Sequence, residues 1–510
     1  MKITRTDNAI RNIVFGVLYK AQSIILPFFI RTVMIYIMGS QYVGLGSLFT
    51  SVLRFLSLAE LGIGNALVFS MYAPIAKDDD ETLCALLNLY RKIYRCIGTV
   101  ILVVGLALMP FLKYLISDGY PADINIYVLY SIYLSNTVIS YLMFGYKQSL
   151  LVAFQRSDII SKRTMAIQVV QNIVQFSVLL LTRNYYLYVI FLPVFTAVTN
   201  IFNLVIVNKM YPQYKCSGNI SKELKRSIIK KVTALIGTKA NTIVLHAADN
   251  VVISAFLGLI TVGIYGNYYH IMNSVVGVIT TIYSSLTAGL GNSLETDNVE
   301  KNYNNFNILS FINFWLVTFC SVCLLCLYQP FMDLWVGKEL MFSFDVVILL
   351  TVYFFVYLIQ RIVTTYKDAS GVWWEDRFRP YVVMFVNLIL NIVLVQVIGI
   401  QGVILSTIVS LLISLPWEIY TVFKFIFKKS SFRYYLKFAK YVVSAIAISA
   451  ITYIVCYWIP YGWIGLFIRA GICVVLPNIL LFLIFFKSNE FRQSMKIVKD
   501  RLKGKLGRKA

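Results

Sequence analysis

Long apolar runs fill most of this chain and restrict it to very few kinds of fold. Fourteen runs reach about 20 residues, the length of a helix that crosses a bilayer. Hydrophobic residues make up 59% of the 510 positions and only 14% are charged, the composition of a polytopic membrane protein. The sequence therefore predicts an all-α protein with about 14 transmembrane helices. The runs lie near 11–38, 42–72, 93–115, 125–148, 160–182, 185–208, 230–258, 260–290, 304–328, 341–366, 379–399, 401–427, 436–458 and 461–486.

The distribution of basic residues predicts how these helices are oriented. The first run is long, contains Lys20 and Arg31, and lacks a cleavage site of small residues, so we expect no signal peptide and a cytoplasmic N-terminus. Most of the 46 Lys and Arg residues then fall on the cytoplasmic side, as the positive-inside rule requires, and the C-terminus is cytoplasmic as well. We interpret the net charge of +23 as an orientation signal and an attraction to anionic membrane lipids, not as nucleic-acid binding.

Two glycine motifs occur twice, in the same order and at nearly the same separation. The first run is followed by Gly39 and Gly44, and the seventh by Gly258 and Gly263. The runs that come next end alike, in LGIGNA and in AGLGNS. Because six spans separate the copies, both have the same orientation and are related by an axis along the membrane normal. We expect two pseudo-symmetric six-helix bundles that face each other across a central cleft.

The repeat also predicts the domain boundaries. The N-terminal six-helix bundle is expected at 1–215 and the C-terminal bundle at 216–430. The remaining segment, 431–510, is expected to form two extra C-terminal helices, which have no counterpart in the repeat, and a basic cytoplasmic tail.

Two stretches of the sequence resemble a known family. They are LPFFIRTVMIYIMGSQYVGLGSLFTSVLRFLSLAELGIGNALVF and DNVVISAFLGLITVGIYGNYYHIM. Both are similar to bacterial polysaccharide flippases, the Wzx-type members of the superfamily that also holds lipid II flippases and multidrug-extrusion antiporters. Such proteins move undecaprenyl-diphosphate-linked oligosaccharides to the outer leaflet by alternating access. The resemblance implies this activity here, in the bacterial cytoplasmic membrane, for a surface polysaccharide such as O-antigen or capsule.

Four charged residues lie inside the first two apolar runs, namely Lys20, Arg31, Arg54 and Glu60. A basic residue at the middle of a bilayer costs about 3 kcal/mol, so these side chains require a polar interior. Lys20 and Glu60 lie at similar depths below the turn at Gly39, and we expect them to form a buried ion pair or to line the cleft.

Arg31 and Arg54 have no carboxylate at a matching depth on the neighbouring run. A guanidinium group binds a diphosphate through paired, charge-assisted hydrogen bonds. Lys239, in the seventh run, would add a cation from the opposite bundle. We predict that these three residues bind the diphosphate of the substrate. The alternative for each is a hydrogen bond to backbone carbonyls or snorkelling to the interface.

A second polar group is expected from Asp249, Asn387, Asn391 and Thr407. Asp249, Asn391 and Thr407 share roughly one depth and are the possible Na⁺ ligands. Oxygen ligands from several helices suit Na⁺, and a lone buried aspartate suits a coupling proton. An interhelical hydrogen-bond network is the third interpretation. The resemblance implies a comparable cation site in lipid II flippases, with a carboxylate where this chain has Asn391. A coupling Na⁺ or H⁺ is the only cofactor expected.

The lengths of the loops and the sign of the buried charges distinguish this chain from other classes of membrane protein. An enzyme that acts outside needs a sizeable external loop, and only 116–124 and 329–340 exceed a few residues. A lipid II flippase and a multidrug or cation antiporter of the same fold remain alternatives, although the unpaired positive charges favour an anionic substrate. The partners expected besides the lipid-linked oligosaccharide and anionic lipids are the polysaccharide polymerase and glycosyltransferases.

Overall fold

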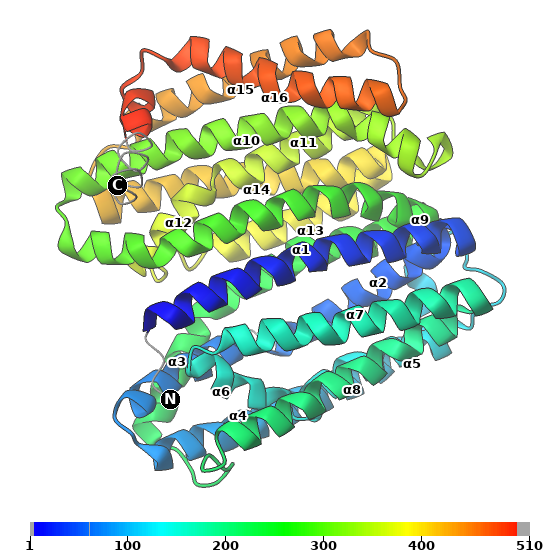
Figure 1. The fold of residues 1–510 in the computed structure, drawn as a ribbon, viewed down its shortest axis with the longest axis vertical. Coiled ribbons are helices and arrows are strands. Elements are labelled where there is room, and N and C mark those ends of the chain that lie inside the picture. Colours follow the sequence, from blue (N-terminus) through cyan, green and yellow to red (C-terminus); the bar gives the residue numbers. More distant parts are fainter. Residues whose placement is uncertain (1–4, 61, 497–510) are drawn as a thin grey trace, which may run out of the picture. The chain divides into compact units, whose positions relative to one another are not determined.

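The computed structural model describes residues 5–60 and 62–496, so the predicted basic tail from 497 onwards lies outside the described residues. The described chain contains 16 α-helices and no strand, which confirms the predicted all-α class (Figure 1). The helices are α1 Arg5–Met38, α2 Ser40–Leu56, α3 Ile63–Ala76, α4 Asp80–Leu108, α5 Ile126–Leu142, α6 Gln148–Ala153, α7 Ser157–Thr182, α8 Tyr185–Met210, α9 Lys222–Thr296, α10 Val299–Trp335, α11 Phe344–Ile359, α12 Arg361–Ser370, α13 Arg379–Ile398, α14 Ile400–Val422, α15 Phe432–Tyr457 and α16 Trp463–Phe485. Short 3-10 or π segments are η1 Ser57–Glu60, η2 Met109–Leu115, η3 Gly145–Lys147, η4 Lys338–Leu340 and η5 Phe423–Phe427.

The number of membrane-crossing helices is lower than the number of apolar runs. Of the described helices, 11 are long and apolar enough to cross a membrane, or 12 if the bent pair Ile126–Leu142 and Gly145–Ala153 is one span. The run at 42–72 is divided between α2 and α3, because the chain leaves the α-helix at η1. Helix α9 carries two predicted runs, which meet at a kink at Gly258. The chain is a multi-pass membrane protein whose spans follow the predicted order.

The helices form two compact units. Unit 1 is Met1–Gly266 and unit 2 is Asn267–Ala510. The division lies within α9, later than the predicted boundary at 215/216, because the start of α9 packs with the N-terminal helices. Ile228 of α9 is part of a buried cluster with Leu67, Leu86 and Leu150. The helices α15 and α16 belong to unit 2.

Polar residues set several helix starts in unit 1. The side chain of Asp79 accepts a hydrogen bond from the Thr82 N–H at 2.9 Å and caps α4. Asn125 and Asn184 cap α5 and α8 in the same way. Helix α1 packs along α7 (Figure 1), where the Gln22 amide donates to the Met165 carbonyl at 2.9 Å. The packing against α7 positions the first helix, on which two of the predicted site residues lie.

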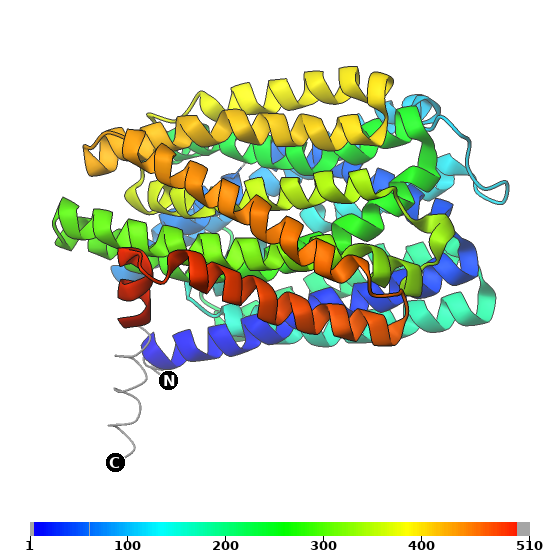
Figure 2. The same cartoon turned by 90° about the horizontal axis from the view of Figure 1, so that it is seen from above.

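In unit 2, α10 packs against α11, α15 and α16. The C-terminal helices, orange and red in Figure 2, contribute to an aromatic cluster in which the Phe314 and Tyr441 rings stack at 4.2 Å. Cys326, Cys456 and Cys473 are buried in the same cluster, with their sulfur atoms within 4.8 Å of one another. Burial of large apolar side chains therefore holds the two extra helices in place.

Candidate functional site

Two glycines connect consecutive helices through the same backbone conformation. Gly39, between α1 and α2, has φ 99° and ψ 168°, and Gly258, at the kink of α9, has φ 84° and ψ 172°. Both combinations are essentially restricted to glycine. The predicted repeat is therefore present in the backbone at this point. The two copies of the second motif differ in backbone structure. In the first copy a new α-helix begins at Ile63, whereas in the second copy Gly289 lies inside α9.

The helices that follow these glycines cross each other in unit 1. A Cβ added to Gly44 would collide with the carbonyl oxygen of Leu259, the residue after Gly258. A Cβ added to Gly263 would collide with the carbonyl oxygen of Ser40, the residue after Gly39. The contact is reciprocal: Gly44 of the first copy packs against the start of the helix after Gly258, and Gly263 of the second copy packs against the start of the helix after Gly39. We call these four residues the glycine crossing.

Arg31 lies at the glycine crossing. Its side chain is half-buried, and its Nη2 donates a hydrogen bond to the Gly263 carbonyl at 3.0 Å. The guanidinium group also occupies the space that a Cβ at Gly266 would need. A backbone carbonyl as partner was the alternative to diphosphate binding, and it is the arrangement that the structure shows for Arg31.

A loop that sequence analysis did not single out holds the kink of α9. The Asp118 carboxylate accepts the Leu259 N–H at 3.0 Å and so caps the helix that begins after Gly258. The Ser117 N–H donates to the Ser254 carbonyl at 3.2 Å, on the other side of the kink. Short polar residues often cap helices. This pairing could not be predicted from a local pattern, because about 140 residues separate the loop from the kink.

The remaining predicted cations of unit 1 have no partner in the described part of the chain. Arg54, in the last turn of α2, is exposed, whereas Lys20 and Lys239 are half-buried. No hydrogen bond or ion pair involves these three side chains among the described residues. Lys20 precedes Gly39 by as many residues as Lys239 precedes Gly258, so the two lysines occupy equivalent positions in the repeat.

The predicted ion pair between Lys20 and Glu60 is not formed among the described residues. The Glu60 carboxylate instead accepts hydrogen bonds from the hydroxyl groups of Tyr94 at 2.9 Å and Tyr141 at 2.7 Å. Depth along two helices was the only basis for the prediction. The break at η1 turns Glu60 toward α4 and α5, which depth alone does not reveal.

The four predicted cation-site residues belong to different units. Asp249, in unit 1, is 3% exposed, and its carboxylate accepts the Tyr265 hydroxyl at 2.9 Å across the kink of α9. In unit 2, the Asn387 amide donates to the Thr407 hydroxyl at 3.1 Å and joins α13 to α14. Asn387, Asn391 and Thr407 are all buried. This bond agrees with the interhelical network for Asn387 and Thr407.

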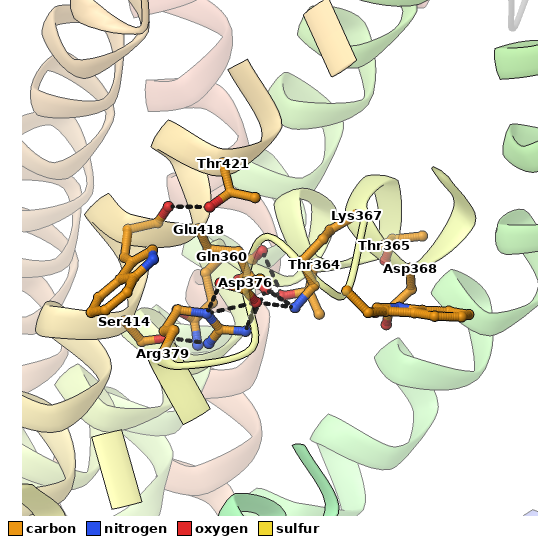
Figure 3. Close-up of polar contacts among 12 residues, drawn as sticks. Gln360, Thr364, Thr365, Lys367, Asp368, Asp376, Arg379, Ser414, Glu418 and Thr421 are labelled. Atoms are coloured by element: carbon orange, nitrogen blue, oxygen red, sulfur yellow. Dashed lines mark hydrogen bonds and ion pairs between the residues drawn. The ribbon is translucent and has the colours of Figure 1, made fainter. Parts of the chain in front are cut away.

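Sequence analysis missed a buried group of four charges in unit 2. Lys367 Nζ lies 2.8 Å from carboxylate oxygens of both Asp376 and Glu418 (Figure 3). Arg379 Nη2 lies 2.6 Å from Asp376 and 3.1 Å from Glu418. No side chain of this four-charge cluster is more than 8% exposed. Glu418, the one carboxylate in the apolar run 401–427, was the signal that could have revealed it.

Two further cations, in unit 1, are buried with neutral partners. Lys147 Nζ donates to the Asn208 side-chain oxygen at 3.0 Å, and Arg163 donates to the side-chain oxygen of Asn203. The Nε and Nη2 atoms of Arg163 are buried without a hydrogen-bond partner in the described residues. Asp158, which lies on the same helix as Arg163, is paired with Arg156 at 3.0 Å. We call Lys147 and Arg163 the amide-paired cations.

Comparison with known proteins identifies the fold. No protein-family model matches the chain, and no curated protein matches it. A solved structure described as lipid II flippase MurJ in an inward closed conformation covers 93% of this chain and 99% of its own, with a TM-score of 0.68 and 15% identity. The chain therefore has the fold of this transporter.

Multidrug transporters share the fold over a shorter part of the chain. An inward-facing multidrug resistance MATE family transporter of the MOP superfamily covers 79% of this chain and 94% of its own, with a TM-score of 0.61 and 13% identity. An outward-facing one covers 83% and 96%, with a TM-score of 0.55 and 12% identity. These likenesses agree with the predicted all-α, polytopic membrane fold.

Proposed function

We propose that this chain is a flippase that moves a lipid-linked, diphosphate-bearing oligosaccharide from the inner to the outer leaflet of the bacterial cytoplasmic membrane, for surface polysaccharide synthesis. The observation that carries the proposal is the set of basic side chains in the helices of unit 1 for which the described residues offer no carboxylate partner, Lys20, Arg54 and Lys239. A diphosphate would compensate these charges. A cationic drug would be repelled by them, which disfavours the antiporter alternative.

The extent of the fold likeness also supports a flippase. The lipid II flippase structure covers 93% of the chain, whereas the inward-facing MATE family structure covers 79%. Transporters of either kind carry out no bond chemistry on their cargo, so we propose no catalytic residue. The termini are proposed to be cytoplasmic, as the distribution of basic residues indicates.

The proposed transport cycle assigns different roles to the cations. Arg54 and Lys239 bind the diphosphate from the cytoplasmic side, and Lys20 adds a charge at the position equivalent to Lys239. Arg31 has a backbone partner at the glycine crossing and stabilises its closed form. Opening on the outer side separates the crossing and releases the Arg31 guanidinium, which then becomes available to the diphosphate. The lipid tail stays in the bilayer throughout.

Asp249 is the proposed site for a coupling Na⁺ or H⁺, because it is a buried carboxylate that accepts a hydrogen bond from the Tyr265 hydroxyl across the kink of α9. Asp249→Asn should make transport in vesicles insensitive to an imposed gradient of the coupling ion. Gradients of Na⁺ and of H⁺ applied separately identify the ion. Unchanged gradient dependence in this variant would exclude Asp249 from coupling.

The function is tested by a mass-spectrometric profile of lipid-linked saccharides in a strain that lacks the gene, with the surface polymer assayed in parallel. Accumulation of one undecaprenyl-diphosphate oligosaccharide, with loss of the polymer, supports the proposal and identifies the sugar. Accumulation of lipid II instead indicates a lipid II flippase. A normal profile together with increased drug sensitivity indicates the antiporter.

The site is tested by complementation of the same strain. Arg54→Ala and Lys239→Ala should each reduce polymer export at least tenfold with unchanged protein levels, because each removes a cation from the diphosphate. Lys230→Ala is the matched control, since Lys230 is an exposed lysine on the same helix as Lys239. Full export by both test variants would overturn the assignment of these residues.

A further inference from the structure

The loop between α12 and α13 carries three large, exposed aromatic side chains. Trp373, Trp374 and Phe378 are 42%, 65% and 59% exposed. Arg377 lies between two of them, with its guanidinium carbon 4.2 Å from the Trp374 ring centre and 4.5 Å from that of Phe378. These distances are those of cation–π contacts. We call residues 373–378 the aromatic loop.

The buried four-charge cluster ties the aromatic loop, through Asp376, to the helices on both sides of it. Lys367, in α12, pairs with Asp376 of the loop, and Arg379 at the start of α13 pairs with the same carboxylate (Figure 3). Arg377 also donates to the Trp374 carbonyl at 2.6 Å. The exposed rings are therefore held on a pre-ordered backbone, which lowers the entropy lost when they bind a partner.

The position of the loop along the helix axis places it at the surface of the bilayer. Helix α13 has 20 residues and is a candidate membrane span. At 1.5 Å per residue it is about 30 Å long, which equals the thickness of the hydrocarbon core. Residues directly before Arg379 therefore lie in the layer of lipid phosphates, where tryptophan and arginine are favoured.

An exposed apolar stripe connects the loop to the lipid-facing side of α13. Phe378 is followed at helical spacing by Val382, Phe385, Ile389 and Val393, which are 39%, 56%, 60% and 49% exposed. The spacing puts all five on one face of the helix. The polar residue Asn387 is buried, on the side of α13 that packs against α14. In a membrane protein, lipid tails are the partner that fits an exposed stripe without polar side chains.

We propose that the aromatic loop binds the phosphate layer of the adjoining leaflet, with Arg377 contacting the phosphate of an anionic lipid and the three aromatic side chains inserted beside it. The exposed Glu375 opposes this contact by repelling the same phosphate. The loop thus anchors the α12–α13 connection to the membrane surface. The inference does not depend on the transported substrate.

The first test measures the depth of the two tryptophans in nanodiscs that contain the full chain. The chain has seven tryptophans, so the difference between wild type and a Trp373→Phe, Trp374→Phe variant isolates the signal of the pair. Lipids brominated near the headgroup should quench this signal more than lipids brominated deep in the tails. Quenching by aqueous iodide without quenching by brominated lipid overturns the proposal.

The second test measures the charge contact. Replacing phosphatidylcholine by phosphatidylglycerol in the nanodisc should raise the Tm of the wild type, and Arg377→Gln should lose about half of that gain. Glu375→Gln should increase the gain. Arg433→Gln is the control, because Arg433 is exposed and lies outside the aromatic loop. Equal losses for Arg377→Gln and Arg433→Gln would show that only net charge matters and would overturn the phosphate contact.

Discussion

The four-charge cluster of unit 2 and the amide-paired cations of unit 1 place buried charge in a membrane protein in opposite ways. In the cluster, Lys367 and Arg379 each lie within 3.1 Å of two carboxylates. In unit 1, Lys147 and Arg163 have amide oxygens as partners. Removing one member of a buried ion pair leaves the other as an uncompensated charge and strongly destabilises the fold. Removing a buried cation whose partner is neutral leaves no such charge, so the expected loss of unfolding free energy is small. The charge of the partner, and not the degree of burial, therefore decides how much each of these residues contributes to stability.

The largest effect is expected from Glu418→Gln. The substitution leaves Lys367 and Arg379 with one carboxylate between them, and breaking a buried ion pair in this way costs about 3–5 kcal/mol of unfolding free energy. Equilibrium unfolding in detergent measures the loss. Glu300→Gln is the control, because Glu300 pairs with Lys429 at an exposed site and should contribute less than about 1 kcal/mol. Equal losses in the two variants would contradict the comparison.

The same substitution in both regions tests the comparison directly. Arg379→Gln should destabilise the protein by about 3 kcal/mol, because it removes one cation from a paired cluster. Arg163→Gln should change the unfolding free energy by less than about 1 kcal/mol, because it also removes a buried charge that pairs with no carboxylate of the described residues. Both values come from the unfolding assay used for Glu418. A larger loss for Arg163→Gln than for Arg379→Gln would reverse the conclusion.

Arg31 is an intermediate case, since it donates a hydrogen bond to a backbone carbonyl. Arg31→Met removes a charged hydrogen bond to Gly263 and relieves the cost of burying the charge, so we expect a net loss of about 1 kcal/mol. Arg54→Met is the matched control on the next helix and should leave stability unchanged, because the described Arg54 side chain has no partner. If the control loses as much as Arg31→Met, the carbonyl contact adds nothing to stability.

The smallest effect is expected at Glu490, which lies after the last span and pairs with Lys437 at 2.6 Å. Partial burial alone would raise the pKa of Glu490, but the hydrogen bond and charge of Lys437 outweigh it and hold the pKa below its usual range. The pair therefore stabilises the fold above the unfolded pKa of about 4.3, and this contribution is lost as pH falls through the folded pKa.

Glu490→Gln should accordingly cost less than about 1 kcal/mol at neutral pH and nothing in strong acid. Unfolding curves of the variant and wild type, recorded across this pH range, should converge at low pH. A constant gap between them would show that the carboxylate acts through packing rather than charge.

Features that repeat along the chain were predictable from the sequence, and features that join distant helices were not. The helical class, the order of the spans and the glycines at 39 and 258 follow from local composition and self-similarity. The partners of Glu60 and Arg31 depend on which way a broken helix or a crossing turns a side chain, which no local pattern encodes. The four-charge cluster joins α12, α13 and α14 through one carboxylate, Glu418, and a loop whose charges look solvated in the sequence.

The division of the chain shows the same limit. A boundary at 215/216 is the natural choice from a six-span repeat, but Ile228 and the rest of the start of α9 pack into the first unit. Sequence periodicity reports where a helix begins, whereas compactness reports which neighbours it buries. Here the two boundaries differ because the first helix of the second copy packs into the unit formed by the first copy.

The glycine crossing has a consequence for the origin of the molecule. Gly44 fits against the residue after Gly258, and Gly263 fits against the residue after Gly39, so the same contact is made twice with the roles exchanged. A contact of this form is what two identical chains make across a two-fold axis. It is the arrangement expected if an ancestral half-length protein worked as a homodimer before gene duplication and fusion joined its two subunits.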